Sequence, residues 1–295
     1  MKQPLILFIA SLWLLASTYA SAEPRCAGDC VAVGQWDISI GLGYGIRSNP
    51  VIGQKDIQYI VVPNVSYYGK HFFINDYDVG YTLWDNEQHQ LNALIFTPGF
   101  EQIFFNEHNI RQLDVKSIAA SPPAMPGDPS TDPSNPTASP GDKSYTNINL
   151  HKRRTAALSG FEYTLIGEHF DWQTQFLQDV SSTHSGQKIR TALTFPWQFN
   201  RQQLSLSTGL TWQSQKLIDY YYGIHANDTA LTEMHYTANA SLAFHVGLEW
   251  EKYFNKHWSI RGVANYRWLG DGVRESPLVE DDAVSTLFMA GVYHF

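Results

Sequence analysis

Residues 236–250 read YTANASLAFHVGLEW, and this stretch decides the fold. Every second residue is apolar: Tyr236, Ala238, Ala240, Leu242, Phe244, Val246, Leu248 and Trp250. The intervening residues are small, polar or charged and end at His245, Gly247 and Glu249. A period of two is typical of a β-strand, because successive side chains point to opposite faces. Strands of soluble sheets usually span only about 5–6 residues, so the length of this alternation indicates a different class of sheet.

The same alternation recurs from Trp36 to Arg47 and over residues 187–199, 202–214 and 257–269. Tryptophans stand near the ends of these stretches, at Trp36, Trp197, Trp212, Trp250, Trp258 and Trp268. Long strands with aromatic ends are typical of outer-membrane barrels. Hydrocarbon satisfies no backbone polar group, so the sheet must close and turn its apolar face outward. The alternative, a soluble sandwich or lipocalin-like barrel, would have shorter strands with the apolar face inside.

We therefore predict an all-β fold, a closed transmembrane antiparallel up-and-down β-barrel of about 12 strands, with 10 as the alternative. The expected strands span residues 35–47, 56–68, 71–84, 89–98, 100–111, 153–166, 170–180, 187–199, 202–214, 235–251, 257–269 and 283–295. Residues 100–111 fit least well, because Pro98-Gly99 and Asn106 to Asn109 interrupt their pattern.

The connections between these strands predict the orientation of the barrel. Short turns fall at Gly69-Lys70, Asn200-Arg201 and Phe254-Asn255, whereas 48–55, 215–233 and 270–282 are longer. Short turns of such barrels face the periplasm and long loops the outside. Residues 112–150 form the longest loop, which is rich in Pro, Ser and acidic residues and should not pack a core.

The N-terminus has the features of an export signal. Lys2 precedes an apolar stretch from Leu5 to Ala16, and Ala20-Ser21-Ala22 resembles a cleavage site. We predict a cleaved signal peptide at 1–22, a periplasmic segment at 23–34, and the barrel at 35–295. Cys26 and Cys30 lie in the short segment, where an exported chain favours a local disulfide.

Composition excludes several other classes of protein. The 295 residues carry 20 Lys plus Arg against 28 Asp plus Glu, a net charge of -8, so we expect no nucleic-acid partner. A mean hydropathy of -0.27 argues against a polytopic helical membrane protein. The predicted location is the outer membrane of a Gram-negative cell, in contact with its lipid and lipopolysaccharide.

We find no pattern that predicts an enzyme, a cofactor or a metal site. His184 has hydroxyls and an acid nearby but falls in a short loop, where such residues commonly stabilise turns. His245 and Ser241 share a strand face, but four residues along a strand separate them by about 13 Å. The 11 His residues show no ligand spacing. The chain is therefore predicted not to be an enzyme.

Charged residues on the polar face of the strands are expected to point into the lumen. They are Arg47, Lys188, Arg190, His245, Glu249, Arg261 and Arg267. A mixed-charge lumen is compatible with a wetted pore or with a closed interior crosslinked by ion pairs. Outside the strands, His151-Lys152-Arg153-Arg154 is either a contact for lipopolysaccharide phosphates or a solvated loop base.

Several motifs together resemble the MipA/OmpV family of outer-membrane proteins, named after an MltA-interacting protein. They are P-N-V-S-Y-Y at 63–68 with G-Y-T-L at 80–83, D-Y-Y-Y-G-I at 219–224, and S-P-L-V-E at 276–280 with the last strand ending at Phe295. The resemblance implies a scaffold that links the outer membrane to a lytic transglycosylase and a penicillin-binding protein. A small-solute channel is the alternative. Neither the resemblance nor the residues predict an oligomeric state.

Overall fold

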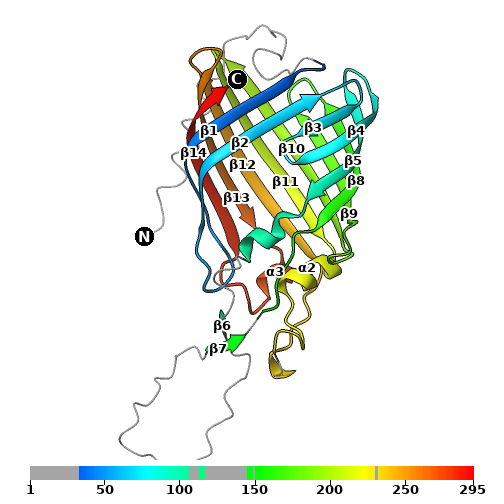
Figure 1. Ribbon diagram of the computed structural model, residues 1–295, viewed down its shortest axis with the longest axis vertical. Coiled ribbons are helices and arrows are strands. Elements are labelled where there is room, and N and C mark those ends of the chain that lie inside the picture. The colour runs from blue at the N-terminus through cyan, green and yellow to red at the C-terminus, as the bar shows by residue number, and fades with distance from the viewer. Residues whose placement is uncertain (1–32, 106–112, 117–144, 149, 230–231) are drawn as a thin grey trace, which may run out of the picture. The chain divides into compact units, whose positions relative to one another are not determined.

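The computed structural model describes residues 33–105, 113–116, 145–148, 150–229 and 232–295. Within them, twelve strands close into an antiparallel barrel in the order β1-β14-β13-β12-β11-β10-β9-β8-β5-β4-β3-β2 (Figure 1). The strands are β1 (Trp36–Arg47), β2 (Ile57–Tyr68), β3 (Phe72–Asn75), β4 (Asp78–Asp85), β5 (His89–Pro98), β8 (Ala157–Ile166), β9 (Asp171–Asp179), β10 (Gln187–Phe199), β11 (Gln202–Gln213), β12 (Ser241–Tyr253), β13 (Trp258–Trp268) and β14 (Ala283–His294). The predicted closed twelve-strand barrel is thus confirmed.

A separate two-stranded sheet pairs β6 (Leu113–Lys116) with β7 (Tyr145–Ile148), on either side of the Pro-rich stretch. The predicted signal peptide, the segment with Cys26 and Cys30 and most of the 112–150 loop lie outside the described residues. No helix among the described residues is long and apolar enough to cross a bilayer.

The two ends of the barrel differ in their connections (Figure 1). At one end, which we call the short-turn end, strands join through a few residues, as at Asn200 and Arg201. Both of these residues have positive φ, 46° and 60°, as a two-residue hairpin turn requires. The other end, the long-loop end, carries the short helices η2 (Phe100–Phe104), α2 (Gln215–Tyr222), η3 (Thr232–Met234) and α3 (Asp271–Arg274).

The outer face of the barrel is apolar. Ile38, Leu42, Leu193, Leu248 and Met289 are among the large apolar side chains that stay exposed. Neighbouring strands add aromatic pairs at the short-turn end, where the rings of Trp36 and Tyr67 lie 4.8 Å apart and those of Trp258 and Tyr293 5.0 Å apart. An apolar band with an aromatic border is typical of a barrel surface that contacts the hydrocarbon core of a membrane. The opposite face of each strand lines the interior because the barrel is closed.

Two of the predicted strands are wrong, and their errors compensate in the strand count. Residues 71–84 are not one strand but the hairpin β3–β4, which turns at Asp76 with a φ of 53°. The predicted strand 100–111 is instead the helix η2 in its described part. Phe100, Ile103 and Phe104 are spaced three and four residues apart, which is a helical and not a strand spacing.

The short hairpin leaves part of β2 with one partner strand. From Ile57 to Asn64, β2 pairs with β1, and it meets β3 only from Ser66 onward. Pro63 lies in this one-sided stretch, where a residue without an N–H is tolerated as on any edge strand. At the tip of the hairpin, the ring of Tyr77 contacts that of Phe100 at 5.4 Å, so η2 adjoins the hairpin.

Candidate functional site

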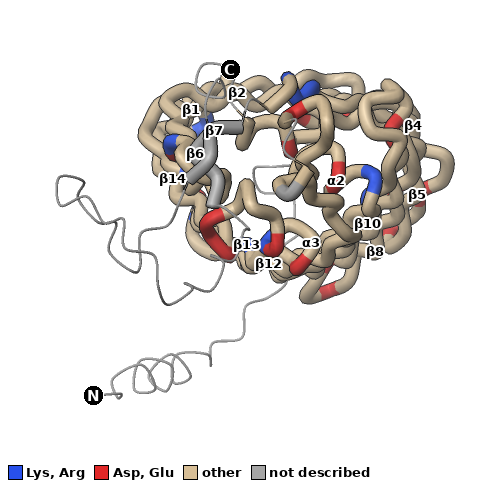
Figure 2. The backbone as a smooth tube through the Cα atoms, turned by 90° about the horizontal axis from the view of Figure 1, so that it is seen from below, with Lys and Arg blue, Asp and Glu red and all other residues tan. Residues whose placement is uncertain are grey.

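Loops at the long-loop end fold into an apolar core of their own, which we call the cap. Leu217, Ile218 and Tyr221 on α2 are fully buried, as are Ile224 and Leu278. Around them pack Val51, Phe104, Phe105, Leu150, Tyr222, Met234, Ala238, Val273, Val279 and Val284. Figure 2 looks onto this end and shows α2 and α3 close to each other. Burial of this apolar surface stabilises loops that are otherwise far apart in sequence.

Polar contacts connect α2 to the loops around it. The Asp219 carboxylate accepts a hydrogen bond from the backbone N–H of Ala238 at 2.8 Å and pairs with His225 at 3.1 Å. The Ser276 hydroxyl donates to the carbonyl of Tyr222 at 2.6 Å. Asp219, Tyr222 and Ser276 all belong to motifs that carry the family resemblance, and in the structure these motifs hold the cap together.

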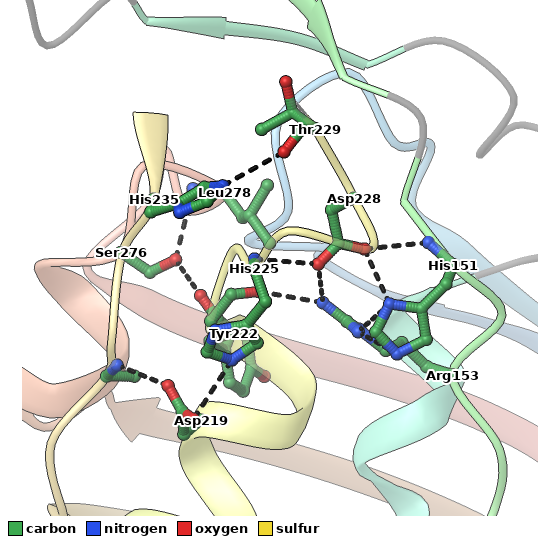
Figure 3. A network of polar contacts seen from close by, with 12 residues as sticks. His151, Arg153, Asp219, Tyr222, His225, Asp228, Thr229, His235, Ser276 and Leu278 are labelled. Atoms are coloured by element: carbon green, nitrogen blue, oxygen red, sulfur yellow. Dashed lines mark hydrogen bonds and ion pairs between the residues drawn. The ribbon is translucent and has the colours of Figure 1, made fainter. Parts of the chain in front are cut away.

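A buried carboxylate, Asp228, organises a second network in the cap (Figure 3). It accepts hydrogen bonds from the backbone N–H groups of His151 at 2.8 Å and His225 at 3.0 Å, and lies 2.7 Å from the His151 ring. The Arg153 guanidinium lies 3.6 Å away and donates to the carbonyl of Gly223 at 2.8 Å. Burial alone would raise the pKa of Asp228, but these hydrogen bonds and the Arg153 charge lower it below its ordinary value.

Arg153 corrects the interpretation of the basic cluster at 151–154. Its side chain is 1% exposed, so it is neither a solvated loop base nor available to lipopolysaccharide phosphates. It also lies over the ring of Tyr220, 5.8 Å from the centroid. Lys152 and Arg154 remain exposed.

His184 stabilises a loop. The Asp179 carboxylate accepts hydrogen bonds from the backbone N–H groups of Ser181, His184 and Ser185 at 2.7–2.8 Å. His184 Nδ1 accepts one from the N–H of Gly186 at 2.9 Å. The imidazole is therefore engaged in the turn, in line with its interpretation as a turn residue.

Five of the seven charged residues predicted to face the lumen lie near the long-loop end of their strands. They are Arg47, Lys188, Arg190, His245 and Arg267, each on the face opposite the exposed apolar side chains. Arg267 is directly opposite His245 across β13 and β12. Lys188 forms a short ion pair with Glu101 on η2, and Glu101 also accepts a hydrogen bond from Gln213 at 2.9 Å.

The other two, Arg261 and Glu249, lie nearer the short-turn end. Arg261 donates two hydrogen bonds to Glu251, at 2.9 Å and 2.7 Å, and lies 3.5 Å from Glu249. Glu251 also pairs with His294 at 3.5 Å. Here the interior cation is matched by acids on the adjacent strand.

Sequence reasoning missed Glu101, Asp228 and Glu251. The alternation pattern assigns Glu101 to a strand, although the helical spacing of Phe100, Ile103 and Phe104 around it indicates a helix. Asp228 lies in a loop without periodicity, so nothing in the sequence indicates that it is buried. Among the described residues, no three His, Cys, Asp or Glu side chains converge as metal ligands would.

Comparisons with known proteins agree with this architecture. The family model "MltA-interacting protein MipA" matches residues 40–295. The MltA-interacting protein of Escherichia coli K12 is 21% identical over 271 residues, which cover 90% of this chain and 93% of the relative. The putative outer membrane protein YiaT of the same strain is 22% identical, with 87% and 89% covered. The outer membrane protein OmpV of Vibrio cholerae is 26% identical over 41% of this chain and 48% of its own.

Proposed function

This chain belongs to the MltA-interacting protein MipA family of outer-membrane β-barrels, and we propose that it is a non-enzymatic scaffold between the outer membrane and murein-remodelling enzymes. The proposed partners are a lytic transglycosylase and a penicillin-binding protein. The observation that carries the proposal is the match of residues 40–295 to this family. The name of the family refers to an interaction with MltA. The folded cap adds support, because loops packed into a core at one end suit a structural barrel better than a wide pore.

The contact surface we propose is the rim of the short-turn end, which would face the periplasm. Its turns are fixed by hydrogen bonds, since Asn255 Oδ1 accepts from the backbone N–H groups of His257 at 2.9 Å and Trp258 at 3.0 Å. Lys70, Arg201 and Lys256 project from three of these turns and are exposed. Rigid turns that present cations lower the entropy cost of docking an acidic protein surface.

A binding measurement with matched variants tests this surface. The refolded full chain is immobilised in detergent, and purified lytic transglycosylase and penicillin-binding protein are passed over it. The triple variant Lys70→Glu, Arg201→Glu, Lys256→Glu should lose about tenfold or more in affinity, as reversal of rim charges allows. The control Lys55→Glu, Arg154→Glu, Lys216→Glu reverses three exposed charges at the long-loop end and should bind normally. Absence of binding by the unaltered protein, or equal loss in both variants, would contradict the proposal.

A small-solute channel is the second candidate. The observation that favours it is Arg190, which is exposed although it lies on the inner face of β10. An inner side chain can stay exposed only where the interior is not filled by protein. Single-channel conductance of the refolded protein, compared with Arg190→Ala, Arg261→Ala, tests this candidate. Discrete steps with altered ion selectivity in the variant support it, and a folded barrel without conductance contradicts it.

A further inference from the structure

The interior beneath the cap gathers four cations from three strands. Arg47 ends β1, Lys188 and Arg190 lie near the start of β10, and Arg267 lies near the end of β13. All four positions are at the long-loop end, because adjacent strands run in opposite directions. Arg267 lies within electrostatic range of both Arg47 and Arg190, and Lys188 within range of Arg190 and Arg267. The four side chains thus form one group, which we call the cationic cluster.

Three members of the cationic cluster lack a carboxylate partner. Within the described residues, the guanidinium groups of Arg190 and Arg267 take part in no hydrogen bond or ion pair. Arg47 lies over the ring of Phe104, 5.6 Å from its centroid, and its Nε is buried without a hydrogen-bond partner. A buried donor without a partner is costly, so such groups are usually satisfied by a protein group, water or a ligand.

The acids near the cluster do not neutralise it. Glu101 pairs with Lys188 and is the one acid that forms an ion pair with a member of the cluster among the described residues. Asp78 on β4 interacts with Arg190 at longer range without an ion pair. Arginines brought together in this way repel one another unless an anion lies between them. The planar guanidinium suits phosphate and carboxylate groups, which it binds through two parallel hydrogen bonds.

The cationic cluster borders open lumen on one side and the cap on the other. Arg190 is exposed. Gly209 on β11 pairs with His245 on β12 and adds no side chain to the wall beside the imidazole. A Cβ on Gly209 would come within 2.7 Å of the His245 ring, so glycine is needed to seat the imidazole. On the cap side the buried Tyr222 lies within electrostatic range of Arg267 and Arg47. The interior therefore has a cationic end beside the cap.

We propose that the cationic cluster of Arg47, Arg190 and Arg267 is a binding site for a small multivalent oxyanion, a compound bearing phosphate or several carboxylates. The anion enters from the short-turn end and is stopped beneath the cap. His245 borders the site and supplies a further donor. This site depends neither on the scaffold role nor on conduction, since binding of an anion inside one end of the barrel requires neither.

Isothermal titration of the refolded full chain with inorganic pyrophosphate, in detergent free of lipopolysaccharide, tests the site. The variant Arg190→Gln, Arg267→Gln should lose about tenfold or more in affinity, while Arg190→Lys, Arg267→Lys should retain part of it. Arg261→Gln is the matched control, because that arginine is also interior but is paired with Glu251. It should bind within about twofold of the unaltered protein.

A second variant predicts a change in the opposite direction. Glu101→Gln removes the acid of the cluster and should tighten pyrophosphate binding by about threefold or more. If the double arginine variant does not fold, the pyrophosphate affinity of Glu101→Gln is the test. Weaker or unchanged binding by Glu101→Gln overturns the proposal. The proposal is also overturned if the unaltered protein does not bind pyrophosphate, or if Arg261→Gln loses as much affinity as the double arginine variant. Added lipid A should leave binding unchanged, whereas displacement would place the phosphate site on the outer surface and overturn the interior assignment.

Discussion

The two ends of this barrel are built on different principles. At the short-turn end, the strands meet in tight turns, and the interior cation Arg261 is matched by Glu251 and Glu249. At the long-loop end, loops distant in sequence share an apolar core around Leu217 and Leu278. Below that core, cations outnumber acids.

The comparison separates what the membrane dictates from what it leaves open. Any outer-membrane barrel needs a closed wall with an apolar outer face. No such requirement explains a buried Asp228 and Arg153 pair or an interior with unequal charge. The cap and the cationic cluster are therefore the places where function beyond forming a membrane barrel should be sought.

Removal of one charge from the cap should give the largest effect. Asp228→Asn leaves Arg153 buried without a charged partner, and breaking a buried ion pair in this way costs about 3–5 kcal/mol. We expect faster amide hydrogen exchange in residues 214–240, with the heat-modifiable gel mobility of the barrel retained. Unchanged exchange would mean that the network contributes nothing to the cap. Loss of heat-modifiable mobility would mean that the two ends are not independent.

A cavity in the cap core should have a somewhat smaller effect. Leu217 is 0% exposed, and Leu→Ala at a buried site costs about 2–4 kcal/mol. Leu217→Ala should open the cap to limited proteolysis between α2 and β12. The control Leu210→Ala removes the same atoms from the outer face of β11, where the side chain is 42% exposed, and should leave the cap resistant. Equal sensitivity in both variants would argue against a separate core.

At the short-turn end the corresponding change should be mild. Asn255→Ala removes two hydrogen bonds within one exposed turn, which is worth about 1 kcal/mol. Urea unfolding in detergent should show a small loss of barrel stability, with no change in cap exchange. A loss as large as that of Asp228→Asn would remove the contrast between the ends.

The smallest effect concerns pH. Burial lowers the pKa of His184, although Asp179 and Glu101 oppose this and Lys188 adds to it. The rings of Tyr220 and Tyr221 also face the imidazole. The unfolded loop therefore binds a proton below about pH 6.5 while the folded loop does not. Loop stability is fully present above that pH and should fall as the pH drops from 7 to 5, as measured by exchange of residues 180–186. His184→Gln should remove this dependence, and a pH dependence that persists in it would assign the effect to another group.

The wall of the barrel could be predicted from the sequence because a single rule, apolar outward at every second residue, applies to each strand. The same rule predicts a strand over 235–251, but β12 begins only at Ser241. Residues 235–240 alternate like a strand and yet lie outside the barrel wall. In this segment Tyr236 forms an isolated β-bridge with Ile224, and the backbone N–H of Ala238 donates a hydrogen bond to Asp219. The extended segment is therefore part of the cap and not of the barrel wall. Periodicity detects extended backbone but does not say which sheet it joins.

The cap could not be predicted because its contacts join loops with no shared period. Val51, Leu217 and Leu278 lie in three separate connections, and only tertiary packing brings them together. The motifs at 219–224 and 276–280 carry the family resemblance in the sequence, but the contacts of Asp219 and Ser276 that explain them are visible only in the fold. The orientation of the ends relative to the periplasm stays a prediction.

Hydrogen exchange of the unaltered protein in detergent, resolved by peptide, is the most direct test of a folded cap at one end. We predict that the amides of α2 and of residues 276–279 exchange as slowly as those of β11 and β12, because both sets are hydrogen-bonded within folded structure. Exchange of these segments at the rate of open loops, with the strands protected, would contradict the account.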